Sequence, residues 1–250
     1  YRLLSKEIRR CCGGWLAECF VIERAVVSAL KSLIYRVFTK NIAVRGDKHY
    51  TMLVFKFGGA SVKDADNIVN LANVVKQFDG NQLLIVVSAK GKTTNALERL
   101  TKAYVDGDEQ MHTVFDEIKK YHYDIIEQLF EKQDNIFNEV ANTFVEIDWI
   151  IEDEPHDDYD FIYDQIVSIG ELVSTRIVNA YLNKSGVKSQ WVDVRGFVHT
   201  DNNYREGGVQ WGKTKESIST GIPPLLQKGA VVTQGFLGGT SENFTTTLGR

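Results

Sequence analysis

Two strand–loop–helix units that follow one another restrict the fold of this chain more than any other feature. The first begins with the apolar run Met52 to Phe57, passes through Gly58-Gly59 and continues in a helical pattern of apolar residues up to Phe78. The second begins with Gln82 to Val87, passes through a polar loop and continues in a helical pattern from Ala96 to Tyr104. Successive units of this kind favour an α/β fold with a parallel sheet, whose ligands lie at the carboxyl ends of the strands. We therefore expect both loops at one edge of the sheet.

The first unit carries a lysine inside its strand. Lys56 lies among apolar residues, where an ammonium group loses hydration unless an anion or another partner compensates it. Gly58 and Gly59 let a bound group approach main-chain N–H donors, and they permit the positive φ angles of an anion-binding nest. Ser61 or Asp64 can cap the helix that follows, and helix N-termini attract anions. The unit predicts a phosphate site, although a snorkelling lysine and an ordinary glycine turn explain the same residues.

The second loop is rich in hydroxyl groups. Its Gly91-Lys92-Thr93 triplet is similar to the end of a P-loop, but Val86 occupies the position where that motif requires a glycine, so the P-loop interpretation fails. Ser88, Thr93 and Thr94 remain as residues that can contact a polar ligand. Thr94 equally suits the N-cap of the following helix.

The rest of the chain continues the α/β pattern. From about Asp108 to Asn183 there are almost no helix breakers, and the first part of this region predicts two or three helices. Further elements are expected as a long helix from about Asp158 to Leu182, strands at Ser189–Val194 and Ala230–Thr233, a weaker strand at Phe197–His199, and a short helix that Pro223 and Pro224 open and that runs through Gln227.

The long helix contributes a candidate carboxylate. Glu171 has mostly apolar neighbours, so it is expected close to buried surface, where a carboxylate needs a cationic or hydrogen-bonding partner. Gly170 beside it allows close approach of backbone or ligand. A glutamate on the helix surface is the alternative. At the end of the chain, Arg250 can pair bidentately with a carboxylate or a phosphate.

Charge and cysteine divide the chain into two segments. Residues 1–51 hold ten Lys/Arg, four Asp/Glu and all three cysteines, a net charge of +6, whereas residues 52–250 hold 19 and 29, a net charge of −10. Because the first methionine is Met52, we expect residues 1–51 to precede the natural start; a basic amphipathic arm is the alternative.

The acidic main segment argues against a nucleic-acid partner. It contains no cysteine, which excludes a disulfide framework and a thiolate metal site there, and no metal ligands are assigned. No apolar run approaches the length of a membrane span. We expect the cytoplasm as the compartment.

Five blocks of the main segment resemble, in order and spacing, the signature blocks of the aspartokinase family. The resemblance covers Met52 to Arg250 and not residues 1–51. One position departs from the family pattern, since Ala60 stands where a threonine is common, and we expect this change to be tolerated. The blocks are Lys56–Val62, Val87–Ala89 with Thr94-Asn95, Ser168–Glu171, Val232–Phe236 and Thr245–Arg250.

The resemblance implies the amino-acid kinase fold, a three-layer αβα sandwich around a mainly parallel sheet. It also implies ATP-dependent phosphorylation of the β-carboxylate of L-aspartate with Mg²⁺, the reaction that opens lysine, threonine and methionine biosynthesis. Residues 52–250 would be the N-terminal, amino-acid-binding part of the kinase domain. The nucleotide-binding remainder and the regulatory domains would follow Arg250, so we expect this 250-residue chain to be inactive by itself and the full-length protein to form a homo-oligomer.

The resemblance also implies roles for single residues. Lys56 would bind the transferring phosphate as the catalytic residue, and Phe57, Gly58 and Gly59 would complete the ATP site, with the two glycines donating N–H groups. Glu171 would bind the α-amino group of aspartate. Further residues of the aspartate pocket would be Ser88, Thr94 and Arg250. No general base is needed, because the attacking carboxylate is already ionised near neutral pH.

Two alternatives remain at this stage. Another enzyme of the same fold, acting on glutamate, acetylglutamate or a nucleotide, would share the sheet and the loops, but an amine-binding Glu171 suits a free α-amino acid. A non-catalytic effector-binding or assembly subunit would share the fold without turnover, and the retained Lys56 argues against it.

Overall fold

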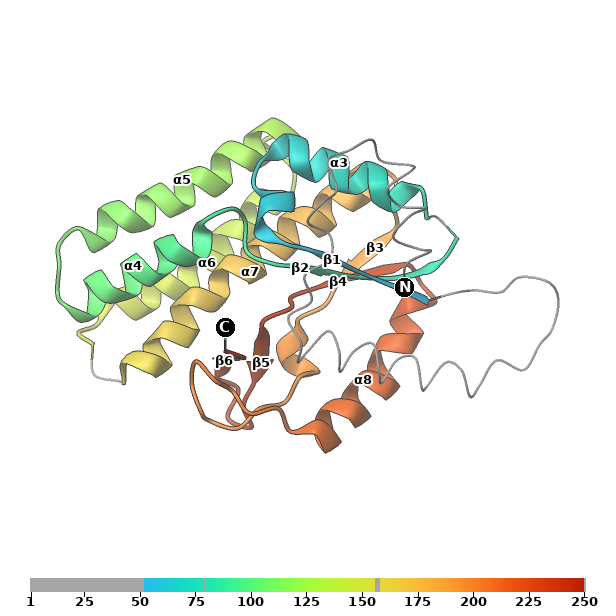
Figure 1. Ribbon diagram of the computed structural model, residues 1–250. Coiled ribbons are helices and arrows are strands. Elements are labelled where there is room, and N and C mark those ends of the chain that lie inside the picture. The colour runs from blue at the N-terminus through green and yellow to red at the C-terminus, as the bar shows by residue number, and fades with distance from the viewer. Residues whose placement is uncertain (1–51, 79, 156–157, 250) are drawn as a thin grey trace.

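The computed structural model describes residues 52–78, 80–155 and 158–249, which form three layers (Figure 1). A four-stranded parallel sheet with strand order β1-β2-β4-β3 is the middle layer. Helices α3 to α7 lie over one face, and α8 covers the other (Figure 1). The predicted α/β sandwich with a parallel sheet is therefore confirmed. The expectation about residues 1–51 falls outside the described residues.

The central strands are apolar along nearly their whole length. Strands β2 (Gln82–Val87) and β4 (Ala230–Thr233) are flanked by the edge strands β1 (Met52–Phe57) and β3 (Ser189–Trp191). Every residue of β2 after Gln82 is buried, as is every residue of β4. A sheet that is covered on both faces requires continuous apolar strands rather than alternating ones, which is the pattern observed.

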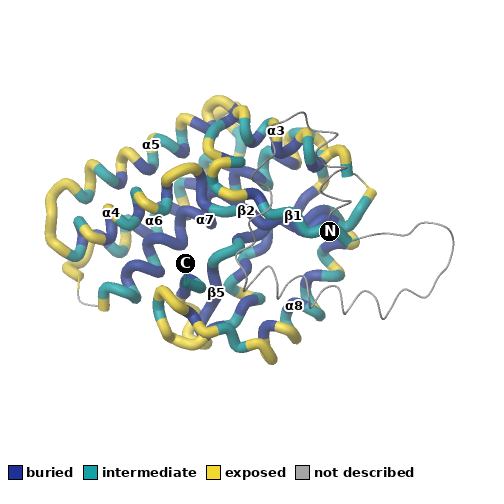
Figure 2. The backbone as a smooth tube through the Cα atoms, viewed as in Figure 1, coloured by how far each residue is buried: buried dark blue, intermediate teal, exposed yellow. Residues whose placement is uncertain are grey.

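Helix α7 (Tyr159–Lys184) is the buried axis of the helical layer. Its residues between Ile162 and Val178 are buried almost without interruption (Figure 2). It packs against α4 (Thr93–Val105), α6 (Ile136–Glu152) and the strands. A helix that is apolar on all sides belongs inside the molecule, whereas an outer helix has one polar side.

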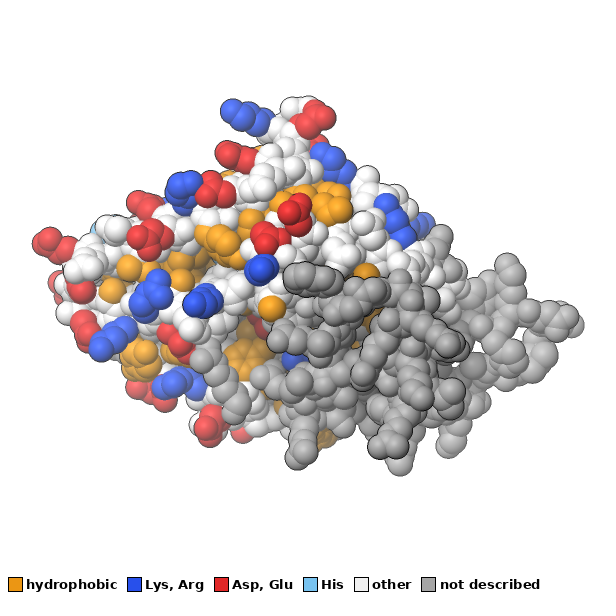
Figure 3. All heavy atoms as spheres, turned by 45° about the horizontal axis from the view of Figure 1, so that its top comes forward, with side chains coloured by type: hydrophobic (Ala, Val, Ile, Leu, Met, Phe, Trp, Pro, Cys, Tyr) orange, Lys and Arg blue, Asp and Glu red, His pale blue; other side chains and the backbone are white. Residues whose placement is uncertain are grey.

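The remaining helices of this layer are α3 (Ala65–Lys76) and α5 (Met111–Leu129). Asp64 is the N-cap of α3, because its side chain accepts a hydrogen bond of 2.9 Å from Asn67 N; Ser61 lies instead in the short helix η1 (Gly59–Val62). On the face shown in Figure 3, acidic and basic side chains are interspersed over the helical layer. No helix within the described ranges combines the length and the apolar character that crossing a bilayer requires.

Helix α8 (Trp211–Leu226) corrects one prediction. Pro223 and Pro224 do not open a helix but lie in the last turn of one that begins at Trp211. Ile218, Ile222 and Leu226 are buried on one side of α8 at i, i+4 and i+8. The burial of this apolar stripe stabilises the helix by more than the loss of the two main-chain hydrogen bonds that the prolines remove at its end.

The segment after β3 is also less regular than predicted. The strand ends at Trp191, and the short helix η2 (Val194–Gly196) follows, with the side chain of Asp193 accepting a hydrogen bond of 3.0 Å from Arg195 N. The weaker strand candidate forms only an isolated bridge, between His199 and Gly239. A side chain that satisfies a nearby backbone N–H competes with extended pairing and ends the strand.

A small antiparallel pair, β5 (Leu237–Gly239) and β6 (Thr245–Thr247), was not predicted. Asp164 of α7 holds it: one carboxylate oxygen accepts from Thr247 N at 2.9 Å and from Arg205 N at 2.7 Å, and the other accepts from Thr247 Oγ1 at 2.7 Å. Burial raises the pKa of Asp164. The neighbouring Gln165 exchanges hydrogen bonds of 3.0 and 3.1 Å with the backbone of Thr245. Strand β6 is thereby fixed to α7.

Replacing Asp164 by asparagine tests this anchor. The amide NH₂ group cannot accept a hydrogen bond, so at least one buried donor loses its partner, and we expect the free energy of unfolding to fall by about 1–3 kcal/mol. Asp160→Asn is the matched control, because Asp160 forms a half-exposed ion pair of 2.9 Å with Arg205 whose loss costs less than about 1 kcal/mol. Urea unfolding followed by circular dichroism measures both values. Equal losses in the two variants would contradict the anchoring role of Asp164.

Candidate active site

The loops that follow β1 and β2 meet at the carboxyl edge of the sheet. Ser88 N donates a hydrogen bond of 3.0 Å to Phe57 O, and Gly91 N donates one of 3.0 Å to Gly59 O. The predicted placement of both loops at one edge is confirmed. Because β1 and β2 pair in parallel, with Lys56 opposite Val86, the two loops leave the sheet side by side.

Gly59 is required by close contact. A Cβ atom at this position would lie 2.6 Å from Ala89 O and 3.1 Å from Gly91 O, both of them backbone atoms. Neither glycine uses the positive φ angles that glycine permits: Gly58 has φ −75°, and Gly59 is not among the residues with positive φ. The left-handed residue of the two loops is Gly91, with φ 51°. Gly58 is exposed, and a Cβ there would meet no atom within 4 Å.

Helix α7 reaches the second loop. Ser174 Oγ donates a hydrogen bond of 2.8 Å to Ser88 O. At Gly170 a Cβ atom would lie 3.3 Å from Ala89 Cβ and 3.2 Å from Thr93 Cγ2. The small residue at this position lets the helix lie directly against the loop, as expected of a glycine inside a helix.

Glu171 joins α7 to the turn after β4. Its side chain is only 6% exposed, and Oε2 accepts hydrogen bonds of 3.0 Å from Gly235 N and 3.1 Å from Phe236 N. The predicted buried carboxylate with hydrogen-bond partners is confirmed, and the alternative of a surface glutamate is wrong. Binding of an amine by Glu171 stays a prediction. Thr175 adds a second link between α7 and this turn. Its Oγ1 donates a hydrogen bond of 2.8 Å to Glu171 O and accepts one of 2.7 Å from Gln234 Nε2.

Lys56 lies near the carboxyl end of β1 and is partly buried. The rings of Phe55 and Phe57 contact each other, and Phe55 contacts Phe78 just beyond α3, so these two phenylalanines lie on the α3 face of the sheet. Because side chains alternate along a strand, Lys56 lies on the opposite face, on the side of α8.

The other predicted site residues differ in outcome. Ser88 and Thr94 are partly buried in and after the second loop. Thr94 lies in the first turn of α4, whose N-cap position is Lys92, so the N-cap alternative for Thr94 is wrong. The helix begins earlier than expected because Ala96 N already bonds to Lys92 O at 3.1 Å. Arg250 lies outside the described residues.

One residue of the second loop was missed by the sequence interpretation, and Thr93, which was expected among the hydroxyl groups of that loop, lies buried at the start of α4. Lys90 is fully buried, and its Nζ donates a hydrogen bond of 3.3 Å to Val62 O in η1. Thr93 Oγ1 is buried without a hydrogen-bond partner. Nothing in the local pattern pointed to the burial of Lys90, since a lysine beside a glycine in a polar loop is usually exposed.

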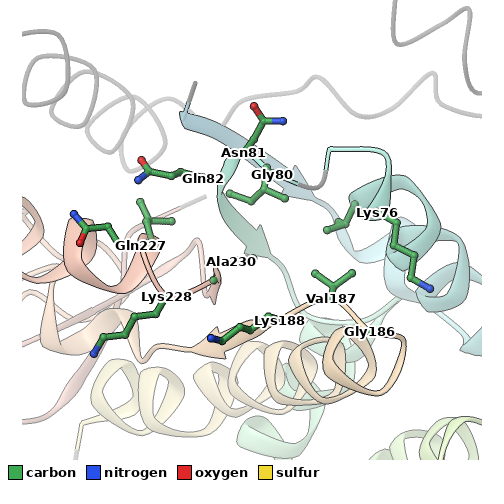
Figure 4. Close-up of a pocket in the computed structure, with 14 residues that line it drawn as sticks. Lys76, Gly80, Asn81, Gln82, Gly186, Val187, Lys188, Gln227, Lys228 and Ala230 are labelled. Carbon is green, nitrogen blue, oxygen red and sulfur yellow. The ribbon is translucent and has the colours of Figure 1, made fainter. Parts of the chain in front are cut away.

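A cavity lined by described residues lies elsewhere, away from the two loops. It has a volume of about 690 Å³ and is formed at the amino ends of β2, β3 and β4, opposite the two loops (Figure 4). Lys76, Lys188 and Lys228 line it, but their side chains point in different directions (Figure 4). In parallel sheets ligands bind at the carboxyl ends, and no polar groups converge here, so we assign no chemistry to this cavity.

The fold and the residues at the carboxyl edge of the sheet together define a class of protein. They describe an α/β protein in which a glycine turn, a strand lysine and a buried helical glutamate occupy one edge of a parallel sheet, an arrangement typical of small-molecule and phosphate sites. Residues 51–250 match the amino acid kinase family. The chain belongs to this family.

The relatives are aspartokinases, which confirms the resemblance noted in the sequence. Lysine-sensitive aspartokinase 3 of Escherichia coli is 32% identical over 200 residues, which cover 80% of this chain and 43% of that protein. Aspartokinase 1, chloroplastic, of Arabidopsis thaliana is 31% identical over 208 residues, which cover 79% of this chain and 35% of that protein. Among solved structures, E. coli aspartokinase III in complex with aspartate and ADP matches with a TM-score of 0.73 at 30% identity, over 80% of this chain and 44% of that one. The chain therefore spans less than half the length of these relatives.

Substitution of the two adjacent glycines tests how the loops are packed. Gly59→Ala places a methyl group against Ala89 O and Gly91 O, so we expect it to lower the free energy of unfolding by about 1–3 kcal/mol. Gly58→Ala is the matched control and should change stability by less than about 1 kcal/mol, because the site is open and its backbone angles suit alanine. Thermal and urea unfolding give both values. A Gly59→Ala protein as stable as Gly58→Ala would show that the loops do not need this contact.

Proposed function

We propose that the protein transfers the γ-phosphoryl group of ATP to the β-carboxylate of L-aspartate, giving 4-phospho-L-aspartate at the start of lysine, threonine and methionine biosynthesis. One observation carries the proposal: Glu171, a buried carboxylate, lies at the same sheet edge as the packed loops and accepts the N–H groups of Gly235 and Phe236. The E. coli relative that was solved with aspartate and ADP supports this pair of substrates.

The nucleotide side of the site is assigned to the first loop. Lys56 supplies a cation near the end of β1, and the exposed Gly58 leaves the backbone of the turn open to a phosphate group. Phe57 is 5% exposed and contributes through its backbone, since Phe57 O holds Ser88 N. Phosphoryl transfer depends mainly on positioning and on neutralising the charge of the oxygens, which a lysine and main-chain N–H groups provide.

The amino-acid side is assigned to α7 and the second loop. The Glu171 carboxylate binds the α-amino group, because a buried carboxylate gains most from a cationic partner. Ser88 and Thr94 offer hydroxyl groups on the neighbouring loop, and Arg250 is assigned to a carboxylate of the substrate. Aspartate is ionised near neutral pH, so the residues need only bind and orient its β-carboxylate, without a general base.

Magnesium is assigned to the nucleotide rather than to a protein cage. Within the described ranges, no group of three or more His, Cys, Asp or Glu residues is arranged to hold a metal ion. Mg²⁺ commonly keeps its waters and binds substrate phosphates with few protein ligands, which fits this edge. When bound, the ion neutralises oxygen charge during transfer.

The relatives are more than twice as long as the segments that match this chain. We therefore assign the rest of the nucleotide site and the regulatory parts to regions outside the matched segment. We expect the 250-residue chain alone to lack turnover, and the protein encoded by the complete gene to be a cytoplasmic homo-oligomer. Formation of aspartyl phosphate by the 250-residue chain with ATP and Mg²⁺ would contradict the first expectation.

Two substitutions in the protein as its gene encodes it separate the assigned roles. Lys56→Met should lower kcat roughly 100-fold or more, because a cation at the transferring group is lost. Glu171→Gln keeps an oxygen acceptor for Gly235 and Phe236 but removes the charge, so KM for aspartate should rise about tenfold with a smaller change in kcat. Trapping of the acyl phosphate with hydroxylamine measures turnover. Full turnover in Lys56→Met would favour a non-catalytic role for this chain.

Substrate choice supplies a further test of Glu171. A carboxylate that binds an ammonium group should reject N-acetylaspartate, in which that charge is absent, so we expect binding of aspartate and no measurable binding of the acetylated compound. Isothermal titration calorimetry compares the two ligands. Equal affinity would assign the protein to the acetylated-substrate branch of the same fold.

A further inference from the structure

Lys90 connects the second loop to the first at two places. Its backbone neighbours contact Gly59, through Gly91 N to Gly59 O at 3.0 Å and through the close approach of Ala89 O. Its own side chain extends to the other end of η1, where Nζ donates to Val62 O at 3.3 Å. The turn from Gly58 to Val62 is thus held at both ends by the loop that carries Lys90.

The ammonium group of Lys90 is buried, and it forms no ion pair with any residue that the structure describes. The side chain is 0% exposed, and none of the ion pairs closer than 4.0 Å in the described part of the chain includes it. Asp64 is the carboxylate whose charge acts on Lys90, and it already accepts hydrogen bonds from Asn67 N and Nδ2 as the cap of α3. A buried cation with one carbonyl partner is poorly compensated.

The groups that face this site from the packed elements do not compensate it either. Lys63 beside Asp64 and Lys92 on the same loop are exposed cations, and Tyr121 of α5 donates its hydroxyl hydrogen to Lys63 O. His122 of α5 is fully buried, with Nδ1 2.8 Å from Ile118 O and Nε2 without a partner. Because the Nδ1 contact requires an N–H there, the neutral ring has its lone pair on Nε2.

These surroundings make both groups easy to deprotonate. Burial lowers the pKa of Lys90 to about 7, with the charge of Asp64 acting in the opposite direction. Burial also lowers the pKa of His122 to about 4, and the charge of Lys90 adds to this effect, so the imidazole is neutral at pH 7. Lys90 is therefore the group of this cluster that changes charge near neutral pH.

We propose that Lys90 is a positioning residue of the Gly58–Val62 turn, and that an anion bound at this turn is accompanied by uptake of a proton by Lys90. The inference rests on the proposed function, which places phosphate groups at the turn. The charged amine forms a stronger hydrogen bond to Val62 O than the neutral amine does and adds positive potential beneath the turn. By linkage, an anion that is favoured by the protonated form must in turn favour protonation.

Calorimetric titration of Mg-ATP tests the proposal in the protein encoded by the complete gene. Titrations at pH 7.5 in buffers of different ionisation enthalpy give the number of protons taken up on binding. Wild type should take up on the order of half a proton more than Lys90→Met, in which an unbranched apolar side chain fills the same space. Lys92→Met, an exposed lysine two residues away, is the matched control and should retain the wild-type value.

Each outcome of this experiment has one meaning. Equal proton uptake in wild type and Lys90→Met, with nucleotide bound by both, overturns the role of Lys90 and leaves the proposed function intact. Absence of nucleotide binding in wild type overturns the proposed function and, with it, this inference. If Lys90→Met does not fold, the wild-type uptake measured from pH 6.5 to 9 decides: a maximum between about pH 7 and 8 supports the proposal, and a flat profile contradicts it.

Stability of the 250-residue chain provides a readout without nucleotide. The pKa of Lys90 is about 7 in the folded chain and has its ordinary value of 10.5 in the unfolded chain. Between these two pH values Lys90 is protonated more in the unfolded chain than in the folded one, so the free energy of unfolding of the wild type rises with pH. Lys90→Met should therefore melt at a higher temperature than wild type near pH 6.5, and the difference should narrow as pH approaches 10. A difference that is independent of pH would contradict a buried titrating lysine.

Discussion

The packing of one glycine against a neighbouring loop is the contact on which the candidate site depends. Strands β1 and β2 pair in parallel, so their loops leave the sheet side by side, but only a residue without a Cβ lets the backbone of Gly59 approach Ala89 and Gly91. This contact fixes the turn that follows Lys56 relative to the hydroxyl groups of the second loop. A phosphate donor and a carboxylate acceptor have to be held in line for transfer, and two loops in fixed contact provide such a frame.

Helix α7 carries the second half of the arrangement. Asp164 near its beginning holds strand β6, Glu171 in its middle holds the turn after β4, and Ser174 one turn later holds the second loop. All three side chains are buried, and each bonds to backbone groups of a segment distant in sequence. A single helix thus sets the positions of a strand, a turn and a loop, which is why a helix so deeply buried carries polar residues at all.

Much of this arrangement was predictable from the sequence, and the failures have identifiable causes. The apolar runs at Met52–Phe57 and Gln82–Val87 and the buried setting of Glu171 follow from local pattern, because long periodic segments report burial directly. Helix α8 was missed because Pro223 and Pro224 were given more weight than the stripe ending at Leu226.

The remaining failures concern contacts between segments far apart in the chain. The hairpin of β5 and β6 is held by Asp164, about 80 residues earlier, and the buried side chain of Lys90 is held by Val62 O, 28 residues earlier. Neither leaves a periodic signal. The reason for Gly59 was likewise inaccessible, since a glycine selected by contact and one selected by positive φ are identical in sequence.

The most direct test of the central claim follows the backbone amides of the carboxyl edge by NMR while ligands are added to the protein encoded by the complete gene. Mg-ADP should shift the amide signals of Gly58 and Gly59, and aspartate should shift those of Gly235 and Phe236, whose N–H groups are bonded to Glu171. Shifts confined to the cavity at the opposite edge, around Lys76, Lys188 and Lys228, would contradict the account.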